Sequence, residues 1–215
     1  MKRVFDLTVS LLLLIVLSPV MGVTALCVRK YLGSPVLFRQ CRPGLHMRPF
    51  HILKFRTMTD KRDENGSLLS DSERLTSFGA FLRKTSLDEL PQLINVIKGE
   101  MSLVGPRPLL LRYLPFYTET EKKRFLVRPG ITGLAQISGR NRLTWDERLH
   151  LDVKYVERQS LALDLTIMWK SVIQVLERDG FEEVTERQLP DLDVERLTIP
   201  SSVALSGGIT VNGTR

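Results

Sequence analysis

The feature that most constrains this chain is an uncharged apolar stretch near its N-terminus, LTVSLLLLIVLSPVMGVTALCV, residues 7–28. As a straight helix these residues would reach roughly 33 Å, about the thickness of the hydrocarbon core of a bilayer. A single transmembrane span is the simplest interpretation. A cleaved signal peptide fits less well, because the stretch is long and Arg29 and Lys30 follow it directly.

Two features favour a re-entrant helix over a single span. Ser18 and Pro19 lie at the centre of the stretch, and a proline inside a helix removes one backbone hydrogen bond and bends the axis. Both flanks are basic, at residues 2–3 and 29–30. Because basic flanks prefer the cytoplasmic side, both ends are expected on that side. We therefore predict a helix–break–helix membrane element over residues 1–32.

The net charge of +7 is concentrated at the same end of the chain. Residues 1–60 hold nine Lys or Arg and two Asp or Glu, whereas the other residues hold 22 of each. This distribution indicates an anionic partner near the N-terminus, either lipid headgroups or nucleotide phosphates. We expect no nucleic-acid partner. The sequence leaves the oligomeric state open, a homodimer included.

A small β-hairpin is predicted after the membrane element, with strands over residues 36–40 and 50–56 and a loop rich in Arg, Pro and Gly between them. Lys54 and Arg56 are two residues apart, so they should project from the same face of the second strand. Such a pair could bind a diphosphate. It could equally be a solvated basic strand close to anionic lipid.

The stretch TSLDELPQL, residues 85–93, places Asp88 and Glu89 before a proline. Pro91 suits the first turn of a helix, so either Asp88 or Ser86 is predicted as the N-cap. In both registers Asp88 lies at a helix N-terminus, which favours its ionised form and a bound phosphate. An ionised carboxylate can be a nucleophile or a magnesium ligand. The alternative is that both acids only cap the helix.

Arg107 has an unusually rigid backbone setting, Gly-Pro-Arg-Pro at residues 105–108. A fixed guanidinium group is well suited to forked contacts with phosphate. A second glycine-punctuated region, RPGITGLAQISGRNRLTW, contributes Arg140. No glycine pattern matches a Walker or dinucleotide-binding loop, so an ATPase or a dehydrogenase is not supported.

The C-terminal part is predicted to hold two amphipathic helices, over residues 144–159 and 160–178. Neither has enough consecutive apolar residues to cross a bilayer, so each is a core or membrane-surface helix. The predicted fold class is α+β, mostly helical with a small β-hairpin and an N-terminal re-entrant element. We predict a cytoplasmic catalytic domain over residues 33–189 and a mobile tail over residues 190–215.

Four segments in series resemble the bacterial sugar transferases, the small monotopic phosphoglycosyl transferases. The segments are FDLTVSLLLLIVLSPV, KFRTM, LRKTSLDELPQLINVIKGEMSLVGPRP and RPGITGLAQISGRN. The resemblance implies transfer of a phospho-sugar from a UDP-sugar to polyprenol (undecaprenyl) phosphate, with release of UMP. It implies an enzyme at the cytoplasmic face of the bacterial inner membrane that initiates surface glycan assembly, such as exopolysaccharide or lipopolysaccharide.

The resemblance also assigns roles to residues. It implies that Asp88 is the nucleophile and Glu89 its dyad partner, with Mg²⁺ as cofactor near Asp88. It implies that Ser18 and Pro19 form the break of the membrane helix. It implies that Arg83 and Arg107 contact phosphate, that Lys54 lies beside the site and that Arg140 is a candidate for binding the nucleotide. Together with Arg56, predicted from its strand position, these are the candidate substrate-binding residues. The chain departs from the family at Glu100, where Asp is usual, and at Met47, where Gly is usual.

The mechanism that follows is a covalent, two-step displacement through a phosphoaspartyl intermediate. One alternative is direct attack by the lipid phosphate in a ternary complex, with Asp88 serving only the metal. The alternative from another class is a non-enzymatic peripheral membrane module whose residues 1–60 bind anionic lipid. The sugar and the glycan pathway are not predictable from the sequence.

Overall fold

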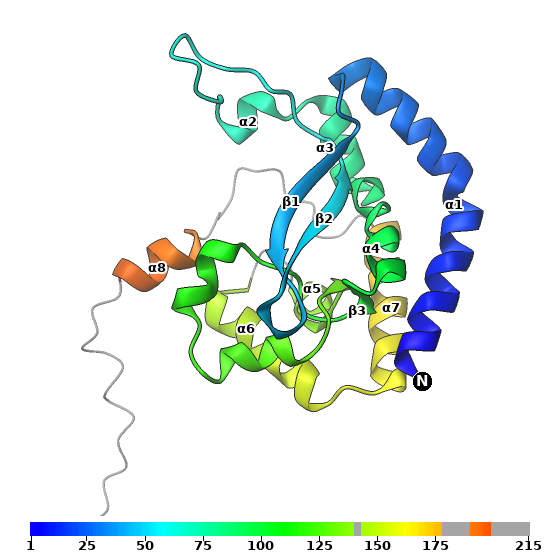
Figure 1. The fold of residues 1–215 in the computed structure, drawn as a ribbon, viewed down its shortest axis with the longest axis vertical. Helices are drawn as coiled ribbons and strands as arrows, with labels where there is room; N and C mark the ends of the chain where they lie inside the picture. The colour runs from blue at the N-terminus through cyan, green and yellow to red at the C-terminus, as the bar shows by residue number, and fades with distance from the viewer. Residues whose placement is uncertain (140–142, 178–189, 199–215) are drawn as a thin grey trace, which may run out of the picture.

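A computed structural model describes residues 1–139, 143–177 and 190–198. Helices predominate, and the strands form two small two-stranded sheets around which the helices are arranged (Figure 1). The α+β class, mostly helical with a small hairpin, is confirmed. The α-helices are α1 Lys2–Leu32, α2 Asp71–Arg74, α3 Ser77–Lys84, α4 Gln92–Lys98, α5 Leu134–Ser138, α6 Trp145–Glu157, α7 Leu161–Leu176 and α8 Leu192–Thr198.

Short 3₁₀ helices and strands complete the chain. The 3₁₀ helices are η1 Leu45–Met47, η2 Leu87–Glu89, η3 Leu111–Phe116 and η4 Glu121–Leu126. The strands are β1 Leu37–Pro43, β2 Pro49–Phe55, β3 Ser102–Val104 and β4 Gly130–Thr132. The predicted hairpin is present as β1 and β2, which pair antiparallel with Leu37 opposite Phe55. Its first strand runs further than expected, to Pro43.

The second sheet pairs β3 with β4 in parallel, Ser102 opposite Gly130. Each strand has three residues, which is too short for a two-residue periodicity to be recognised in the sequence. Glycine permits this pairing to continue into the Gly-Pro-Arg-Pro segment. A Cβ atom on Gly130 would lie 2.1 Å from the Gly105 nitrogen, so the two backbones touch where β3 leads into that segment.

The N-terminal element is one continuous helix, so the predicted division into two helices at Ser18 and Pro19 is not observed. Pro19 cannot donate to the Ile15 carbonyl, the acceptor four residues earlier. The Ser18 hydroxyl donates to that carbonyl instead, at 2.8 Å. Because the freed acceptor is satisfied, the helix continues past the proline, and α1 curves along its length (Figure 1).

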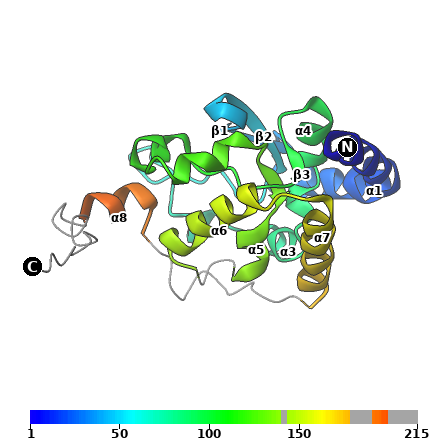
Figure 2. The same ribbon diagram turned by 90° about the horizontal axis from the view of Figure 1, so that it is seen from below.

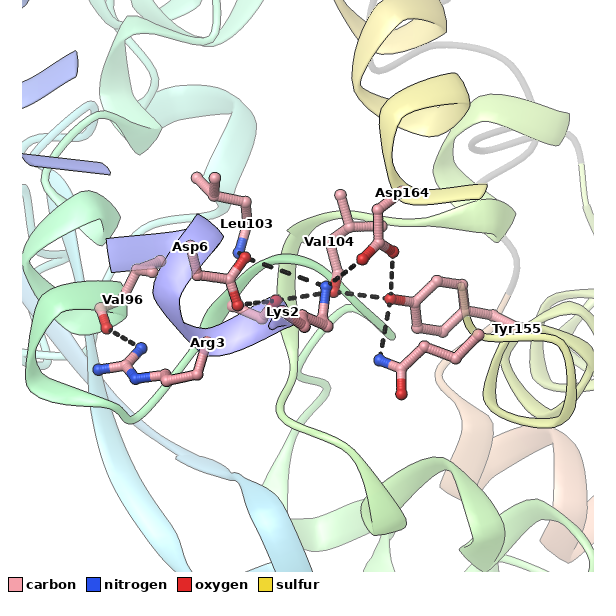
Figure 3. A network of polar contacts seen from close by, with 10 residues as sticks. Lys2, Arg3, Asp6, Val96, Leu103, Val104, Tyr155 and Asp164 are labelled. Atoms are coloured by element: carbon pink, nitrogen blue, oxygen red, sulfur yellow. Dashed lines mark hydrogen bonds and ion pairs between the residues drawn. The ribbon is translucent and has the colours of Figure 1, made fainter. Parts of the chain in front are cut away.

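The N-terminal end of α1 is fixed to the rest of the protein by a polar network (Figure 3). Lys2 Nζ lies 2.6 Å from Asp164 Oδ2 at the start of α7. Arg3 donates to the carbonyls of Val96 and Ile97 at the end of α4. Asp6 is buried and accepts from the Ser102 hydroxyl in β3 at 2.8 Å. Buried charges of this kind are stable only when paired, so this end of α1 is firmly held.

The C-terminal end of α1 packs on the same domain as its N-terminal end. Val28 and Leu32 are buried against Phe55 of β2 and Leu82 of α3. By length and composition α1 is apolar enough to cross a membrane, yet both of its ends contact one domain. The side of α1 that faces away from that domain is exposed and apolar, and includes Val4, Leu11, Leu12, Ile15, Val16, Val20, Val23 and Leu26.

Residues 190–198, within the segment predicted as a mobile tail, contain α8. Leu192 of α8 is fully buried in a cluster with Tyr113 and Trp145. The Trp145 indole nitrogen donates to the Pro190 carbonyl at 2.8 Å, and Arg196 pairs with Glu121 at 2.8 Å. The segment docks because one apolar side chain and several ion pairs act together, although its sequence alone is polar and irregular.

Candidate active site

Asp88 lies in η2, a single 3₁₀ turn that precedes α4. Ser86 precedes η2 in the left-handed conformation, with φ of 56°, and Pro91 precedes α4 with φ of −60°. Ser86 therefore caps the 3₁₀ turn, not an α-helix. Both predictions had a single α-helix starting at Ser86 or Asp88, whereas α4 begins only at Gln92, after Pro91. The turn places the Asp88 side chain inside the protein, where the residue is 7% exposed.

Glu89 is clamped between two cations. Lys54 Nζ from β2 lies 2.6 Å from Glu89 Oε1, and Arg107 Nη2 lies 2.8 Å from the same oxygen. These two contacts bring together segments that are 35 and 18 residues away in sequence. Burial alone would raise the pKa of Glu89, but the charges and hydrogen bonds of Arg107 and Lys54 hold it well below the ordinary value.

The carboxyl group of Asp88 has the opposite environment. Burial, followed by the negative charge of Glu89, raises the pKa of Asp88 to about 6. The positive charges of Lys54, Arg107 and Arg83 oppose this rise. The expectation that a helix N-terminus would favour ionised Asp88 is thus outweighed by burial, although the carboxylate still predominates at neutral pH.

The side chain of Asn95 connects α4 to β2 beside this site. It is fully buried, accepts from the Leu53 backbone N–H at 3.0 Å and donates to the His51 carbonyl at 2.8 Å. It also donates to Glu100 at 2.7 Å. Asn95 belongs to α4 and Leu53 precedes Lys54 in β2, so these bonds fix the strand that carries Lys54 against the helix that follows Glu89.

Arg107 is positioned through its backbone. Pro106 and Pro108 flank it, and its carbonyl accepts from Arg124 Nη2 at 2.7 Å. Arg124 is itself buried and pairs with Asp152 of α6 at 2.8 Å. The Arg107 side chain is 44% exposed, so its guanidinium group can contact both Glu89 and a ligand from solution.

The remaining predicted residues are placed differently. Arg83 at the end of α3 donates to the Thr57 hydroxyl at 3.1 Å, and its charge acts on Asp88. Arg56 directly follows β2, which holds Lys54, but its side chain donates to the carbonyls of Met58 and Ser34 and pairs with the carboxylate of Asp60. Those contacts tie down a loop instead of facing the acidic pair. Arg140 lies outside the described residues.

A magnesium ion at this site would have to be held mainly by substrate. Among the residues that the structure describes, no group of three or more His, Cys, Asp or Glu side chains could hold a metal. Mg²⁺ is commonly bound through one or two carboxylates together with substrate phosphates. Asp88 could supply such a carboxylate, whereas Oε1 of Glu89 is already occupied by Lys54 and Arg107.

An apolar cavity of about 390 Å³ lies between α1 and α3. It is lined on α1 from Pro19 to Cys27 and on α3 by Phe78 and Phe81. Leu87, the neighbour of Asp88 in the chain, also lines it. Through Val20 and Val23 the cavity is continuous with the exposed apolar face of α1.

Sequence reasoning missed the pair of Arg124 and Asp152 that holds the Arg107 carbonyl. Arg124 and Asp152 are 28 residues apart, and no local pattern signals a buried pair at that separation.

Comparison with known proteins gives the context for this arrangement. The family model described as bacterial sugar transferase matches residues 1–178. The chain is 54% identical over 183 residues to the uncharacterized sugar transferase EpsL of Bacillus subtilis (strain 168), covering 85% of this chain and 91% of the relative.

The names of two further relatives state the reaction that each relative catalyses. One is the UDP-glucose:undecaprenyl-phosphate glucose-1-phosphate transferase of Caulobacter vibrioides, 38% identical over 83% of this chain and 71% of the relative. The other is the undecaprenyl-phosphate galactose phosphotransferase of Salmonella typhimurium, 39% identical over 84% of this chain. The chain spans 41% of that relative's length. Since the family model covers most of the chain, and a relative is matched over nearly its whole length, this transferase belongs to the bacterial sugar transferase family.

Proposed function

We propose that this protein transfers a phospho-sugar from a UDP-sugar to polyprenol phosphate and releases UMP. The observation that carries the proposal is the buried carboxylate of Asp88, adjacent to Glu89, which Lys54 and Arg107 hold at 2.6 and 2.8 Å. The names of the Caulobacter and Salmonella relatives support this reaction class. The product is a polyprenyl-diphosphate sugar that initiates assembly of a surface glycan.

The reaction proceeds in two displacements. An oxygen of the Asp88 carboxylate attacks the β-phosphorus of the UDP-sugar, and the bond from that phosphorus to the bridging oxygen breaks, so that UMP leaves with the electron pair. A phosphate oxygen of the polyprenol phosphate then attacks the phosphoaspartyl group, and Asp88 departs as a carboxylate. Positioning and charge stabilisation dominate phosphoryl transfer, which suits a site built from fixed cations.

Glu89, Lys54 and Arg107 act by holding this geometry. The shared oxygen of Glu89 fixes both cations beside Asp88, so that they face the charge that develops on the departing phosphate. Mg²⁺, held by Asp88 and the donor phosphates, would supply further neutralisation of that charge.

The lipid substrate explains the apolar cavity and α1. The cavity lies beside the exposed apolar face of α1 and is lined by Leu87, the neighbour of Asp88, so a prenyl chain can lie in it. Both ends of α1 pack on one domain. A perpendicular span would carry that polar domain into the hydrocarbon, so α1 enters the membrane from one side and both ends stay at the cytoplasmic face.

The test is release of UMP from a panel of UDP-sugars in the presence of polyprenol phosphate and Mg²⁺. We expect one or a few UDP-sugars to be turned over, and Asp88→Asn to lower the rate by at least about 1,000-fold. Parallel double-reciprocal lines support the covalent route, whereas intersecting lines support a ternary complex. A peripheral lipid-binding module would release no UMP and would leave membranes when salt is added.

A further inference from the structure

The N-terminal end of α1 is charged, although the stretch that follows it is uncharged. Three of the first five residues of the helix carry charge, Lys2, Arg3 and Asp6. A membrane anchor needs apolar surface and basic residues that stay in water at the headgroups. Asp6 is instead 2% exposed, and the side chains of Lys2 and Arg3 point toward the protein (Figure 3). Because a buried charge is stable only when it is paired, these side chains serve contacts within the protein.

Arg3 caps the end of α4. Its Nη1 atom donates to the Val96 carbonyl at 2.6 Å, and its Nη2 atom donates to the Ile97 carbonyl at 3.0 Å. The last carbonyls of a helix have no partner within it, and a cation there also interacts favourably with the helix dipole. α4 begins at Gln92, three residues after Glu89. Arg3 therefore fixes the far end of the helix that continues from the acidic pair.

Asp6 holds β3, the strand that leads to Arg107. Its Oδ2 atom accepts from the Ser102 hydroxyl at 2.8 Å, and its Oδ1 atom accepts from the Leu103 backbone N–H at 3.3 Å. The end of β3 runs directly into the Gly-Pro-Arg-Pro segment that carries Arg107. Because one carboxylate contacts two consecutive residues, it fixes both the position of this strand and its orientation.

The same strand is held from its other side by α6 and α7. The Val104 carbonyl accepts from the Tyr155 hydroxyl of α6 at 3.0 Å. That hydroxyl lies 2.7 Å from Asp164 Oδ1, and Asp164 Oδ2 lies 2.6 Å from Lys2 Nζ. The chain of contacts thus returns to α1, as Figure 3 shows. A buried polar network whose members are paired is rigid, so β3 is fixed between α1 and the two C-terminal helices.

The two segments that α1 holds are the ones that connect Glu89 to Arg107. From Glu89 the chain passes through α4 and β3 to Arg107, whose Nη2 atom lies 2.8 Å from Glu89 Oε1. Arg3 and Asp6 are three residues apart on one helix, a spacing that places side chains next to one another on its surface. One turn of α1 therefore sets the end of α4 relative to β3, and with it the separation of Glu89 and Arg107.

We propose that Arg3 and Asp6 are positioning residues of the active site, which set the place of Arg107 beside the acidic pair through α4 and β3. The inference rests on the proposed function and deepens it. Stabilising the departing phosphate requires the guanidinium group at one place, since a misplacement of about 1 Å can lower a rate about 100-fold. α1 is then part of the catalytic scaffold as well as the membrane element, and the site is complete only while α1 is docked on the domain.

The test measures kcat of the full-length protein in nanodiscs. An asparagine at position 6 has one acceptor oxygen in place of two, so Asp6→Asn loses either the Ser102 or the Leu103 contact. We expect Asp6→Asn and Arg3→Gln each to lower kcat about tenfold. The control is Arg29→Gln, which removes a charge from the exposed other end of α1 and should change kcat less than about twofold.

An Arg107→Gln background separates positioning from instability. If Arg3 and Asp6 act through Arg107, each variant should lower kcat less than about twofold once that guanidinium group is absent. A variant that only reduces the amount of folded enzyme lowers the rate equally in both backgrounds. A tenfold fall in both backgrounds, or a wild-type rate for both single variants, would overturn the assignment.

Tyr155→Phe guards against a folding defect in a charge variant. It removes only the hydroxyl that the Val104 carbonyl accepts, so we expect a fall in kcat of about threefold that disappears in the Arg107→Gln background. An equal fall in both backgrounds would count against the assignment.

Hydrogen exchange followed by mass spectrometry tests the same contacts without turnover. We expect amides of residues 102–108 to exchange about tenfold faster in Asp6→Asn, and those of residues 92–98 in Arg3→Gln. Peptides from α8, which lies on the opposite side of the protein from α1 (Figures 1 and 2), should keep their rates. A wild-type enzyme that releases no UMP from any UDP-sugar would refute the proposed function and leave the exchange result standing. Normal UMP release and wild-type exchange in both variants would refute the positioning role alone.

Discussion

Asp88 and Glu89 are neighbours in sequence but have opposite electrostatic environments. Glu89 shares one oxygen between Lys54 and Arg107, which holds its pKa low, whereas burial raises the pKa of Asp88 to about 6. Pairs of titratable groups whose pKa values are pushed apart commonly divide the roles of a site. Here the division assigns Glu89 to holding the cations and Asp88 to the reaction.

The raised pKa makes ionised Asp88 a cost to folding. Its folded pKa lies above the ordinary value of 3.8, so the cost is absent at low pH and grows as pH rises from about 4 to about 6. We predict that Asp88→Asn increases the free energy of unfolding by about 3 kcal/mol at neutral pH. Thermal unfolding in nanodiscs at about pH 4 and about pH 7.5 measures this difference.

The control for this stability prediction is Glu64→Gln, which removes a carboxylate from an exposed loop. It should shift the melting temperature little at either pH. An Asp88→Asn variant less stable than wild type at neutral pH would show that the carboxylate makes a stabilising contact instead.

The same pKa predicts how the first displacement depends on pH. Attack requires the ionised carboxylate, so the single-turnover rate of UMP release without polyprenol phosphate should be level above about pH 7 and fall about tenfold per pH unit below about pH 6. Omitting the lipid removes the titration of its phosphate from the profile. A rate that stays level down to about pH 4.5 would mean that Asp88 is not the attacking group.

At the residue scale the sequence predicted much of the site. Lys54 and Arg107 both contact Glu89, the neighbour of Asp88, as the family resemblance implied. The local patterns alone left a helix cap and a solvated basic strand open for these residues. The partners of Arg56 were not predictable. That side chain folds back on Ser34 and Met58, which depends on where the chain enters the hairpin.

At the scale of elements, Asn95 is the connection that sequence patterns do not reveal. It lies within an apolar helix pattern, yet its amide makes three hydrogen bonds that join α4 to β2 and to Glu100. A short helix and a hairpin have too little apolar surface to dock by burial alone, so directional bonds set their relative position.

We predict that Asn95→Leu lowers the free energy of unfolding by about 2 to 4 kcal/mol, since the Leu53 N–H and the His51 carbonyl lose their partner. Activity should fall further than stability explains, because Lys54 loses its fixed distance from Glu89. Chemical unfolding together with the KM and kcat of folded protein separates the two effects. Asn95→Leu with wild-type stability would refute the role of these hydrogen bonds in joining α4 to β2.

The helix α1 shows that the presence of a helix is easier to predict than whether a proline inside it divides the helix. The apolar run, the proline and the basic flanks are plain in the sequence, and they predicted a membrane element with a break. The hydroxyl of Ser18 satisfies the Ile15 carbonyl that Pro19 leaves free, so the helix bends without being divided. This hydrogen bond from a side chain, in place of one from the backbone, depends on the rotamer of Ser18, which composition does not determine.

At the scale of the whole molecule, the packing of both ends of α1 on one domain supports the proposed topology, in which both ends lie on one side of the membrane. We predict that a cysteine placed before Met1 and one at Tyr31, in a chain with Cys27 and Cys41 replaced by serine, are both labelled by an impermeant maleimide in inside-out vesicles. Neither should be labelled from the outer face of intact spheroplasts. Labelling of the N-terminal cysteine from outside would establish a transmembrane span.

The class of the fold and the order of its longer elements were predictable, but the long-range contacts between its short segments were not. β3 and β4 are each three residues long and pair across 28 residues of chain, between Ser102 and Gly130. α8 docks through Leu192 beyond the region that the family model matches. Both are long-range contacts made by short segments, and neither leaves a periodic pattern in the sequence.

The most direct test of the account is the mass of the peptide that contains Asp88. Enzyme is incubated with its UDP-sugar and Mg²⁺ but no polyprenol phosphate, quenched, digested and analysed by mass spectrometry. We predict a phospho-sugar adduct on Asp88 that disappears when polyprenol phosphate is added and never forms in Asp88→Asn. An enzyme that turns over normally while this peptide stays unmodified, or that carries the adduct on another residue, would contradict the account.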